Sequence, residues 1–449
     1  MISAIILLPV LAGLLAYAFP KALAAQVKWF GVVVGAITLA GVLGAYGMPD
    51  ETHAWLARPF VAAYHVGVGT GPSFWLALLL ALCTTCALIA TRSREQRNFV
   101  AQMLLLEGAM LALFLARDLL LFALAWDLML IPVFILLVGS GGAAHAAWRY
   151  LIYNVTAGLA LLLATAVYGI IFGSTDVIGR AGLPPIGGLW QTWVFIGFAF
   201  AFLVKTPVWP FHTWMPDAYA ESPSPLAAVI SAVQSKGGLY GFLAIAIPLF
   251  PDAAHAAAPF MIGLGLIGLV YGAFASLVQN DIKKIAAYSS LSHLGLILVA
   301  LFSFNTIAVA GAVVYLIAHG LFSATLFLVM GFVEQREETR TLKRLGGLGG
   351  RNPKLAGALS IAALAALGLP GLAGFAGELL IVIGLYGAGL VWAATVALVA
   401  IVLASAYMLR LFQDVMQGRE LADLPQRPDL GWTEGIESWL LCSVHSTKF

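Results

Sequence analysis

Few ionisable side chains lie inside the long apolar stretches of this 449-residue sequence, and these side chains are the ones best able to do chemistry. An ionisable group inside a lipid bilayer is energetically costly, so it usually faces a partner or water and marks the route of an ion. Carboxylates, lysines and histidines at such depth are suited to passing protons from one to the next. The residues that qualify are Glu107, Asp127, Lys205, Lys236, His293, His319 and Glu378.

The three carboxylates have different surroundings. Asp127, in LFALAWDLMLIP, is interpreted as the ion-pair partner of a lysine on another helix, because a lone buried carboxylate would be neutralised. The alternative is a helix-end carboxylate satisfied by the backbone or by Arg149. Glu378 follows GLPGLAGFAG, so we expect it beside irregular backbone and water, as a proton donor or acceptor. Glu107, in LLLEGAML, fits a proton relay and an interhelical hydrogen bond equally well.

The two lysines differ in depth. Lys205 ends an apolar stretch in AFLVKTP, so its long side chain could reach the membrane interface. Lys236, in AVQSKGGLYG, has apolar sequence on both sides and cannot easily reach either interface. We therefore interpret Lys236 as a functional relay residue.

The histidines and cysteines do not favour a metal site or redox chemistry. His293 and His319 lie on consecutive apolar stretches and fit either proton relays or hydrogen bonds between helices; no third residue is evident to complete a metal site. Cys83 and Cys86 form a CxxC inside an apolar run, where thiols behave as small hydrophobic groups, and there is no second CxxC.

Composition identifies the solvent of most of the chain as lipid. Hydrophobic residues make up 61% of the sequence, charged residues 10%, and the mean hydropathy is +0.97. A soluble domain normally has about 25% charged residues. The net charge of +2 and the lack of a basic stripe argue against nucleic acid as a partner.

The chain is predicted to be an all-α polytopic membrane protein with about 13 transmembrane helices, since a crossing takes about 20 apolar residues. The predicted spans are 2–19, 29–47, 71–91, 99–116, 119–139, 149–173, 190–209, 224–250, 258–278, 285–303, 306–333, 355–386 and 388–412. Spanning strands are not expected, because the apolar runs do not alternate.

Two of these spans look discontinuous. Pro207 and Pro210 interrupt the seventh, and Pro370 and Gly371 interrupt the twelfth. Broken helices at matching places in two halves point to an ion pathway in a repeat-built transporter. Their separation by five spans predicts an inverted five-helix repeat. The predicted segments are N-terminal helices in 1–98, half-channel repeats in 99–250 and 258–412, and a short polar tail in 413–449.

Loop lysines and arginines predict the orientation. Most of them fall on the side opposite the N-terminus, whereas the N-terminal side carries only Arg58, Arg117 and Arg180. Positive loops stay in the cytoplasm, so the N-terminus is expected on the non-cytoplasmic side.

The sequence resembles the antiporter-like subunits of respiratory complex I over roughly residues 75–412. The resemblance lies in LVKTPVWPFHTWMPDAYAESPSPLAAVISAVQSKGGLYGF, DIKKIAAYSSLSHLGLILVAL, YLIAHGLFSATLFLVMG and LGLPGLAGFAGELLIVIG, in that order. Within that group it is most similar to the subunit M family of bacterial NADH–quinone oxidoreductase, whose members carry a glutamate in the second broken helix, as Glu378 does here.

The resemblance implies a role for each candidate. Asp127 and Lys205 would form a coupling ion pair, Lys236 would be the central relay, His293 and His319 would bridge the halves, and Glu378 would face the exit. It also implies a proton-translocating subunit in the bacterial inner membrane, partnered by other membrane-arm subunits, especially its sister antiporter-like subunits. No cofactor is expected in this subunit; NADH, FMN, Fe–S clusters and quinone would belong to partner subunits.

Two departures from the family pattern stand out. The ion-pair carboxylate is normally glutamate, and the shorter Asp127 is expected to loosen the contact with Lys205. The family's last helix is expected to be missing, because the end GWTEGIESWLLCSVHSTKF is too polar and short. Three alternatives stay open: a subunit of an Mrp-type cation/proton antiporter, a membrane arm for a hydrogenase or inorganic-carbon uptake, and a structural subunit with vestigial channels.

Overall fold

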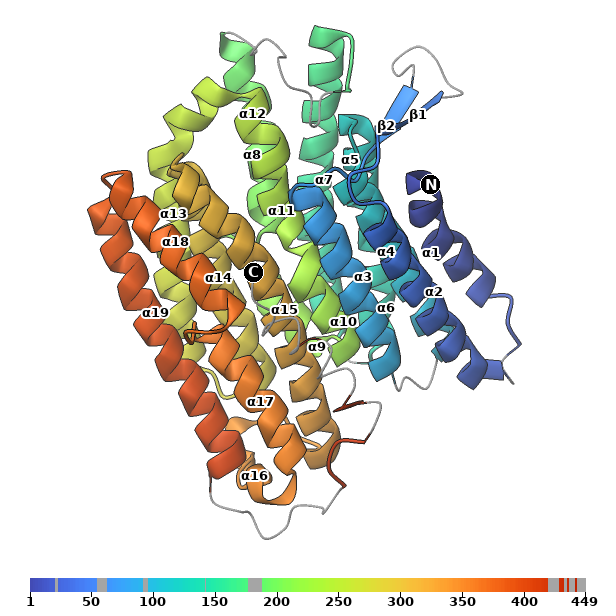
Figure 1. Ribbon diagram of the computed structural model, residues 1–449, viewed down its shortest axis with the longest axis vertical. Helices are drawn as coiled ribbons and strands as arrows, with labels where there is room; N and C mark the ends of the chain where they lie inside the picture. Colours follow the sequence, from blue (N-terminus) through green and yellow to red (C-terminus); the bar gives the residue numbers. More distant parts are fainter. Residues whose placement is uncertain are drawn as a thin grey trace. The chain divides into compact units, whose positions relative to one another are not determined.

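Helices account for nearly all of the computed structural model (Figure 1). The structure describes residues 1–20, 23–54, 63–91, 96–141, 143–176, 188–418, 428–431, 434–435 and 441. Most of the predicted tail lies outside these residues, with Cys442 and the loop residues Lys21, Arg58, Arg92, Arg94 and Arg180.

Ten helices of the described chain are long and apolar enough to cross a bilayer, judged by length and composition. They are Gln26–Gly44, Pro72–Ala90, Gln96–Leu115, Leu119–Val138, Ala144–Phe172, Ser224–Leu249, Pro251–Val278, Ile282–Phe302, Thr306–Glu337 and Val391–Gln417. Four further apolar helices are shorter: Ile2–Ala16, Leu189–Lys205, Pro353–Ala366 and Ala373–Gly387. The all-α membrane fold is confirmed, whereas the count of thirteen crossings stays a prediction.

Both predicted helix breaks are present. α8 (Leu189–Lys205) ends just before Pro207, and α9 (Met215–Glu221) begins after an irregular stretch. α17 (Pro353–Ala366) and α18 (Ala373–Gly387) are likewise separated by irregular backbone, in which Gly368 and Gly371 have φ of +73° and +99°. Residues with a Cβ rarely adopt such angles, so glycine at these two positions is what lets the chain interrupt the helix.

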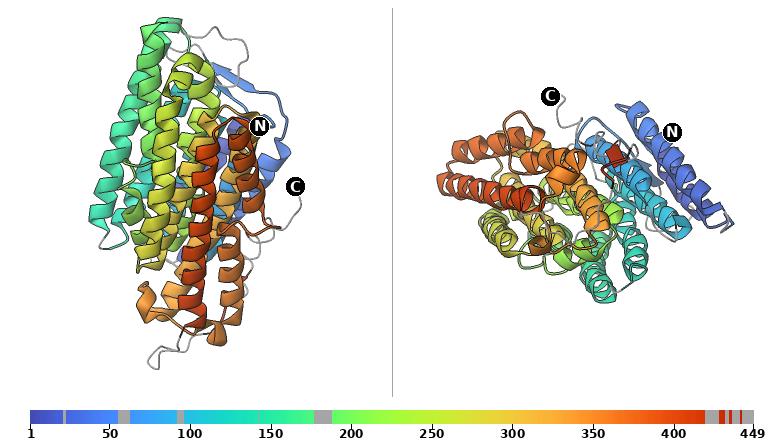
Figure 2. Two further views of the ribbon diagram at one scale, coloured as in Figure 1. Left: turned by 90° about the vertical axis from the view of Figure 1, so that its left-hand side faces the viewer. Right: turned by 90° about the horizontal axis from the view of Figure 1, so that it is seen from below.

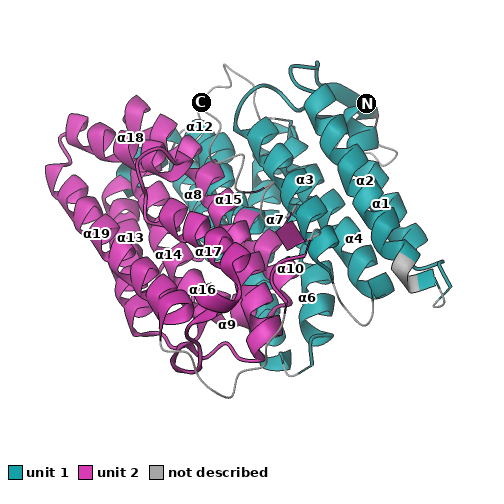
Figure 3. Cartoon of the chain, turned by 60° about the horizontal axis from the view of Figure 1, so that its bottom comes forward, with its two compact units in different colours: residues 1–206, 233–257 teal, residues 207–232, 258–449 magenta. Residues whose placement is uncertain are grey.

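The chain forms two compact units (Figure 3). Unit 1 comprises residues 1–206 and 233–257, and unit 2 comprises residues 207–232 and 258–449. The chain therefore passes between the units three times: in the first helix break, inside the helix that carries Lys236, and near the start of the helix Pro251–Val278. The predicted division at 98, 250 and 412 and the inverted repeat stay predictions.

Unit 1 is built around a buried helix, α4 (Gln96–Leu115), which packs against α1 (Ile2–Ala16), α2 (Ala24–Gly44), α3 (Pro72–Ala90) and α5 (Leu119–Leu128). In a second group of helices, α7 (Ala144–Phe172) packs against α5, α6 (Leu130–Val138) and α8. The turn between α5 and α6 precedes Pro132, which cannot donate a backbone hydrogen bond to Leu128.

A β-hairpin in unit 1 was not predicted. Strands β1 (Glu51–Ala54) and β2 (Ala63–Val66) are antiparallel, with Glu51 opposite Val66. The hairpin lies between two apolar stretches, and Val66 pairs further with Ala116 at the end of α4. Strands of four residues show too little alternation to be recognised in the sequence.

Unit 2 is centred on α15 (Thr306–Glu337), which packs against α10 (Ser224–Val229), α14 (Ile282–Phe302), α17 and α18. α19 (Val391–Phe412) lies beside α17 and α18 (Figures 1 and 2). The further elements of unit 2 include α13 (Pro251–Val278), η4 (Leu342–Arg344), α16 (Leu348–Arg351) and η5 (Gln413–Gln417). The first residues of α13 belong to unit 1.

The helix Ser224–Leu249 alternates between two kinds of helical turn. It comprises α10 (Ser224–Val229), the π-helical η2 (Ile230–Gln234), α11 (Lys236–Gly241), the π-helical η3 (Phe242–Ala246) and α12 (Ile247–Leu249). π-helical turns are rare and are common at functional sites. Lys236 is the first residue of the α-helical turn between them.

Candidate functional site

The structure divides the predicted site residues between the two units. Glu107, Asp127, Lys205 and Lys236 belong to unit 1, and His293, His319 and Glu378 belong to unit 2. The first set lies on α4, α5, α8 and α11, and the second lies on α14, α15 and α18. Each set is described by itself below.

Lys205 is the last residue of α8 and is fully buried. A cation is favourable at this end of a helix, where backbone carbonyl groups are unpaired. The Nζ atom donates a hydrogen bond to Oδ1 of Asn154 on α7 at 3.1 Å and lies 5.2 Å from the centre of the Trp126 ring. Lys205 is therefore held by a neutral amide and an aromatic face, and it does not extend to the surface of the described chain.

Asp127, near the end of α5, packs against Gly158 of α7, four residues after Asn154. A Cβ built on Gly158 would lie 1.8 Å from its Oδ1 atom, so only glycine leaves room for this carboxylate. Lys205 is within electrostatic range of Asp127. In the part of the chain that the structure describes, however, Oδ1 of Asp127 has no hydrogen-bond partner, and no direct ion pair joins it to Lys205 or Arg149.

Lys236 is fully buried in unit 1, where glycines bring α11 close to α8. A Cβ on Gly238 would lie 2.3 Å from the carbonyl oxygen of Phe202 and 2.2 Å from Oγ1 of Thr206. A Cβ on Gly237, the residue after Lys236, would lie 3.7 Å from the Trp126 ring that also faces Lys205. Trp126 is thus a neighbour of Lys205 and of the first turn of α11.

Glu107 lies in the middle of α4 and is fully buried. Among the described residues, neither of its carboxylate oxygens has a hydrogen-bond partner. The next residue, Gly108, packs against Ile6 and Val10 of α1. An interhelical hydrogen bond, one of the two interpretations of Glu107, is thus not formed with the described chain.

In unit 2, His293 and His319 face each other across α14 and α15. Their ring centres are 5.4 Å apart and the ring planes are nearly perpendicular. The Tyr315 ring lies 5.7 Å from that of His293, and the Tyr407 hydroxyl is 3.4 Å from Nε2 of His293. The two histidines that sequence reasoning paired are therefore neighbours, with two tyrosines beside them.

Glu378 lies in the first turns of α18, directly after the second helix break. Its Oε1 atom accepts a hydrogen bond from the Tyr315 hydroxyl at 2.6 Å. Its Oε2 atom lies where a Cβ on Gly368 would come within 2.1 Å, so the carboxylate rests against the irregular backbone. The position beside the break agrees with the sequence interpretation, whereas the tyrosine partner was not foreseen.

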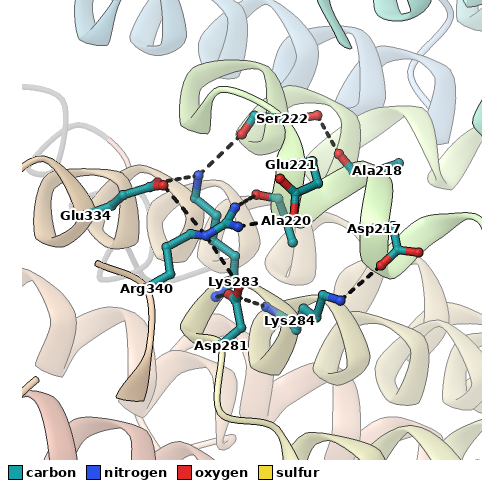
Figure 4. Close-up of polar contacts among 10 residues, drawn as sticks. All are labelled: Asp217, Ala218, Ala220, Glu221, Ser222, Asp281, Lys283, Lys284, Glu334 and Arg340. Atoms are coloured by element: carbon teal, nitrogen blue, oxygen red, sulfur yellow. Dashed lines mark hydrogen bonds and ion pairs between the residues drawn. The ribbon is translucent and has the colours of Figure 1, made fainter. Parts of the chain in front are cut away.

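A second polar cluster in unit 2 connects α9, α14 and the segment after α15 (Figure 4). Lys284 pairs with Asp217 at 3.0 Å, and Lys283 pairs with Glu334 at 2.6 Å. Arg340 pairs with Glu221 at 3.1 Å and with Asp281 at 3.3 Å, and it also donates to the backbone oxygen of Ala220.

The charges of this cluster complete the ends of two helices. Asp281 caps the first turn of α14, and Arg340 and Lys283 donate to the backbone oxygens of Ala220 and Ser222 at the end of α9. Burial raises the pKa of Asp281 above its ordinary value, although the Arg340 guanidinium acts in the opposite direction. The cluster therefore fixes the half-helix that follows the first break.

Comparison with known proteins identifies the family. Residues 116–404 match the family described as NADH:quinone oxidoreductase/Mrp antiporter, TM, which is more than half of the chain. The chain belongs to this family.

Individual family members and one solved structure agree with the match. NAD(P)H-quinone oxidoreductase chain 4 3 of Picosynechococcus sp. is 34% identical, over 94% of this chain and 80% of its own. NADH-quinone oxidoreductase subunit M of Rickettsia prowazekii is 32% identical, over 82% and 76%. A chain of respiratory complex I from Thermus thermophilus with bound NADH has a TM-score of 0.90 at 30% identity, covering 99% of this chain and 94% of that one.

Sequence reasoning missed three side chains that contact the predicted site residues: Asn154, Tyr315 and Tyr407. Each is a buried polar residue in an apolar helix that contacts one of the predicted site residues. The available signal was weak, because an asparagine or a tyrosine in such a helix is usually a hydrogen-bonding or packing residue. Their importance lies in their neighbours, which one sequence does not show.

Proposed function

We propose that this chain is a proton-translocating membrane-arm subunit of an NADH–quinone oxidoreductase. The observation that carries the proposal is the 0.90 TM-score to a chain of respiratory complex I, combined with a buried ionisable side chain beside each break, Lys205 before the first and Glu378 after the second. Proton transfer through such residues is the reason to retain costly charges at membrane depth.

In the first half-channel, we assign to Asp127 and Lys205 the first response to redox chemistry in the partner subunits. A change in the position of the Lys205 ammonium alters the electrostatic field at Lys236, because interactions between charges fall off slowly in a low-dielectric interior. The position of Trp126 between Lys205 and the first turn of α11, and the close approach of α11 to α8, support this coupling. Lys236 then takes up or releases a proton, which is the central step of the proposal. Glu107 is the candidate for an additional relay group.

In the second half-channel, the proposal assigns proton transfer to His293, His319 and Glu378. Each can bind and release a proton, and the hydroxyl of Tyr315 contacts the last of them. Glu378 borders the irregular backbone of the break, where non-helical segments at membrane depth commonly line a wet cavity. We therefore assign Glu378 to the exit side.

The proposal leaves redox chemistry to partner subunits. NADH, FMN, Fe–S clusters and quinone are assigned to them, as the resemblance to complex I subunits implies; among the described residues no group of three possible metal ligands occurs. The partners are other membrane-arm subunits, above all its sister antiporter-like subunits. The chain is a multi-pass membrane protein. We place it in the bacterial inner membrane with its N-terminus on the non-cytoplasmic side.

The deciding experiment replaces the central lysine in the assembled complex. Lys236→Ala is expected to lower the number of protons moved per NADH oxidised after reconstitution into liposomes, with normal abundance of the complex. Lys343→Ala, at an exposed position, is the matched control and should behave as wild type. Wild-type pumping by an assembled Lys236→Ala complex would overturn the proposal.

A second candidate is a subunit of an Mrp-type cation/proton antiporter, because the family description includes both classes. The two functions differ in what drives transport. A pump subunit moves protons only during electron transfer from NADH to quinone, whereas an antiporter moves them in response to a sodium gradient. Sodium-driven proton movement in vesicles without NADH would favour the antiporter.

A further inference from the structure

One face of α7 carries three residues that contact Gln234, Lys205 and Asp127, respectively. They are Tyr150, Asn154 and Gly158, spaced four residues apart and so aligned along one side of the helix. The Tyr150 hydroxyl accepts a hydrogen bond from Nε2 of Gln234 at 2.8 Å, two residues before Lys236. Successive positions on this face are separated by about 6 Å along the helix axis.

The side-chain amide of Asn154 has only one orientation that satisfies both of its ends. Nδ2 donates to the backbone oxygen of Tyr150 at 2.8 Å, and Oδ1 accepts from Nζ of Lys205 at 3.1 Å. A lysine ammonium can only donate, so it requires the oxygen of the amide. Asn154 is fully buried, and its partner is fully buried too. The contact is therefore a specific one inside unit 1.

Asp127 meets the same face one turn further along, at Gly158. Its Oδ1 atom has no hydrogen-bond partner among the described residues. Lys205 is fully buried, and Asp127 is partly buried with its Oδ1 atom shielded from solvent. Opposite charges in such surroundings attract each other, so separate positions need an interaction that holds the lysine apart. The amide of Asn154 supplies it. The Asp127 side chain is one methylene group shorter than a glutamate and does not hydrogen-bond to Lys205, which is held by the amide instead.

We propose that Asn154 is the alternative hydrogen-bond partner of Lys205, and that Lys205 alternates between the Asn154 amide and the Asp127 carboxylate during the transport cycle. The inference rests on the proposed function, because it assumes that Lys205 takes part in coupling. An amide binds the ammonium without exchanging a proton with it, so it can hold Lys205 away from Asp127 and release it intact. Asn154 is thus a positioning residue.

The first arm of the test removes the amide. Asn154→Leu keeps the approximate size of the side chain but has no acceptor for Lys205. In the assembled complex, NADH-driven proton transport is expected to fall about tenfold, the size expected from one hydrogen bond to a charged group. Thr156→Leu, at an exposed position of the same helix, is the matched control and should pump as wild type. If the leucine variant does not assemble, Asn154→Val, which also has no acceptor, replaces it under the same criteria.

The second arm asks whether a longer carboxylate can replace the amide. Asp127→Glu adds one methylene group and brings the carboxylate closer to Lys205. The double variant Asn154→Leu with Asp127→Glu is therefore expected to recover proton transport to within two- to threefold of wild type. A purely structural role of Asn154 would not be repaired by a change on another helix, so absence of recovery would overturn the inference.

A third variant separates the two proposals. Lys205→Ala should abolish coupled transport if the lysine takes part in coupling. If Lys205→Ala is inactive and Asn154→Leu pumps as wild type, the role of Asn154 is wrong and the proposed function stands. If Lys205→Ala itself pumps as wild type, the role of Lys205 in the proposed function is wrong, and the inference about Asn154 is wrong with it.

Discussion

The hydroxyl of Tyr315 donates a hydrogen bond to Oε1 of Glu378 at 2.6 Å, and both side chains are buried in unit 2. Tyr315 lies one helical turn before His319 on α15, and its ring is 5.7 Å from that of His293. The tyrosine is therefore in contact with the carboxylate and close to the histidine pair. It connects the proposed exit group to the groups that would deliver protons to it.

Replacement of Tyr315 by phenylalanine tests this connection. Tyr315→Phe keeps the ring and its packing but removes the donor to Glu378. A hydrogen bond of about 1 kcal/mol or somewhat more predicts a three- to tenfold decrease in the rate of NADH-driven proton transport. The rate is measured in liposomes containing the assembled complex, with Tyr386→Phe as the control at a position that is 68% exposed. Equal rates for both variants would contradict a role of the hydroxyl.

Glu378→Gln separates proton transfer from hydrogen bonding. The amide oxygen of glutamine still accepts from Tyr315, but the side chain can no longer bind and release a proton. Proton transport per NADH oxidised is expected to decrease at least as much as in Tyr315→Phe, while the amount of assembled complex stays normal. Glu338→Gln, at an exposed position, serves as the control. Full pumping by Glu378→Gln would reduce Glu378 to a structural acceptor.

The sequence predicted those features of the site that are determined by residues close together in the chain. Glycine and proline at 368–371 predicted the second break, and the break placed Glu378 beside irregular backbone, because backbone restrictions act within a few residues. The sequence also placed His293 and His319 on consecutive helices, whereas the contact between their rings was seen only in the structure. Each of these interpretations needed only short stretches of the chain.

The partner of Lys205 could not be predicted in the same way. Asp127 and Asn154 are both polar residues in apolar helices, and which of them meets the lysine depends on how α5 and α7 are rotated against α8. The π-helical turns on either side of Lys236 were also missed, because a single additional residue in a helical turn leaves little trace in an apolar sequence. Only packing between distant segments decides these features.

Close packing of α11 on α8 makes Gly238 sensitive to a single methyl group. In Gly238→Ala the new Cβ would lie 2.3 Å from the backbone oxygen of Phe202, which cannot move without displacing α8. Overpacking of this kind costs about 1–3 kcal/mol or more. The expected result is less assembled complex in membranes and a lower temperature of inactivation. Gly263→Ala, where a Cβ would meet no atom within 4 Å, should have no such effect.

Arg340 is expected to stabilise the half-helix α9 in unit 2. It pairs with Glu221, Asp281 and Glu334 and donates to the backbone oxygen of Ala220, so its loss leaves three carboxylates and a helix end without their common cation (Figure 4). Because the Arg340 side chain is 25% exposed, water screens part of each interaction, and the total is expected to be about 1–2 kcal/mol.

Arg340→Gln tests this estimate against Arg344→Gln, which removes the same charge at an exposed position four residues later. The first variant should inactivate at a temperature lower by a few degrees and become more susceptible to proteolysis near α9, and the second should match wild type. High salt should narrow the difference, because mobile ions screen partly exposed pairs. Equal stability of the two variants would mean that α9 is held by packing against α14 rather than by charge, since apolar contacts are insensitive to the loss of Arg340.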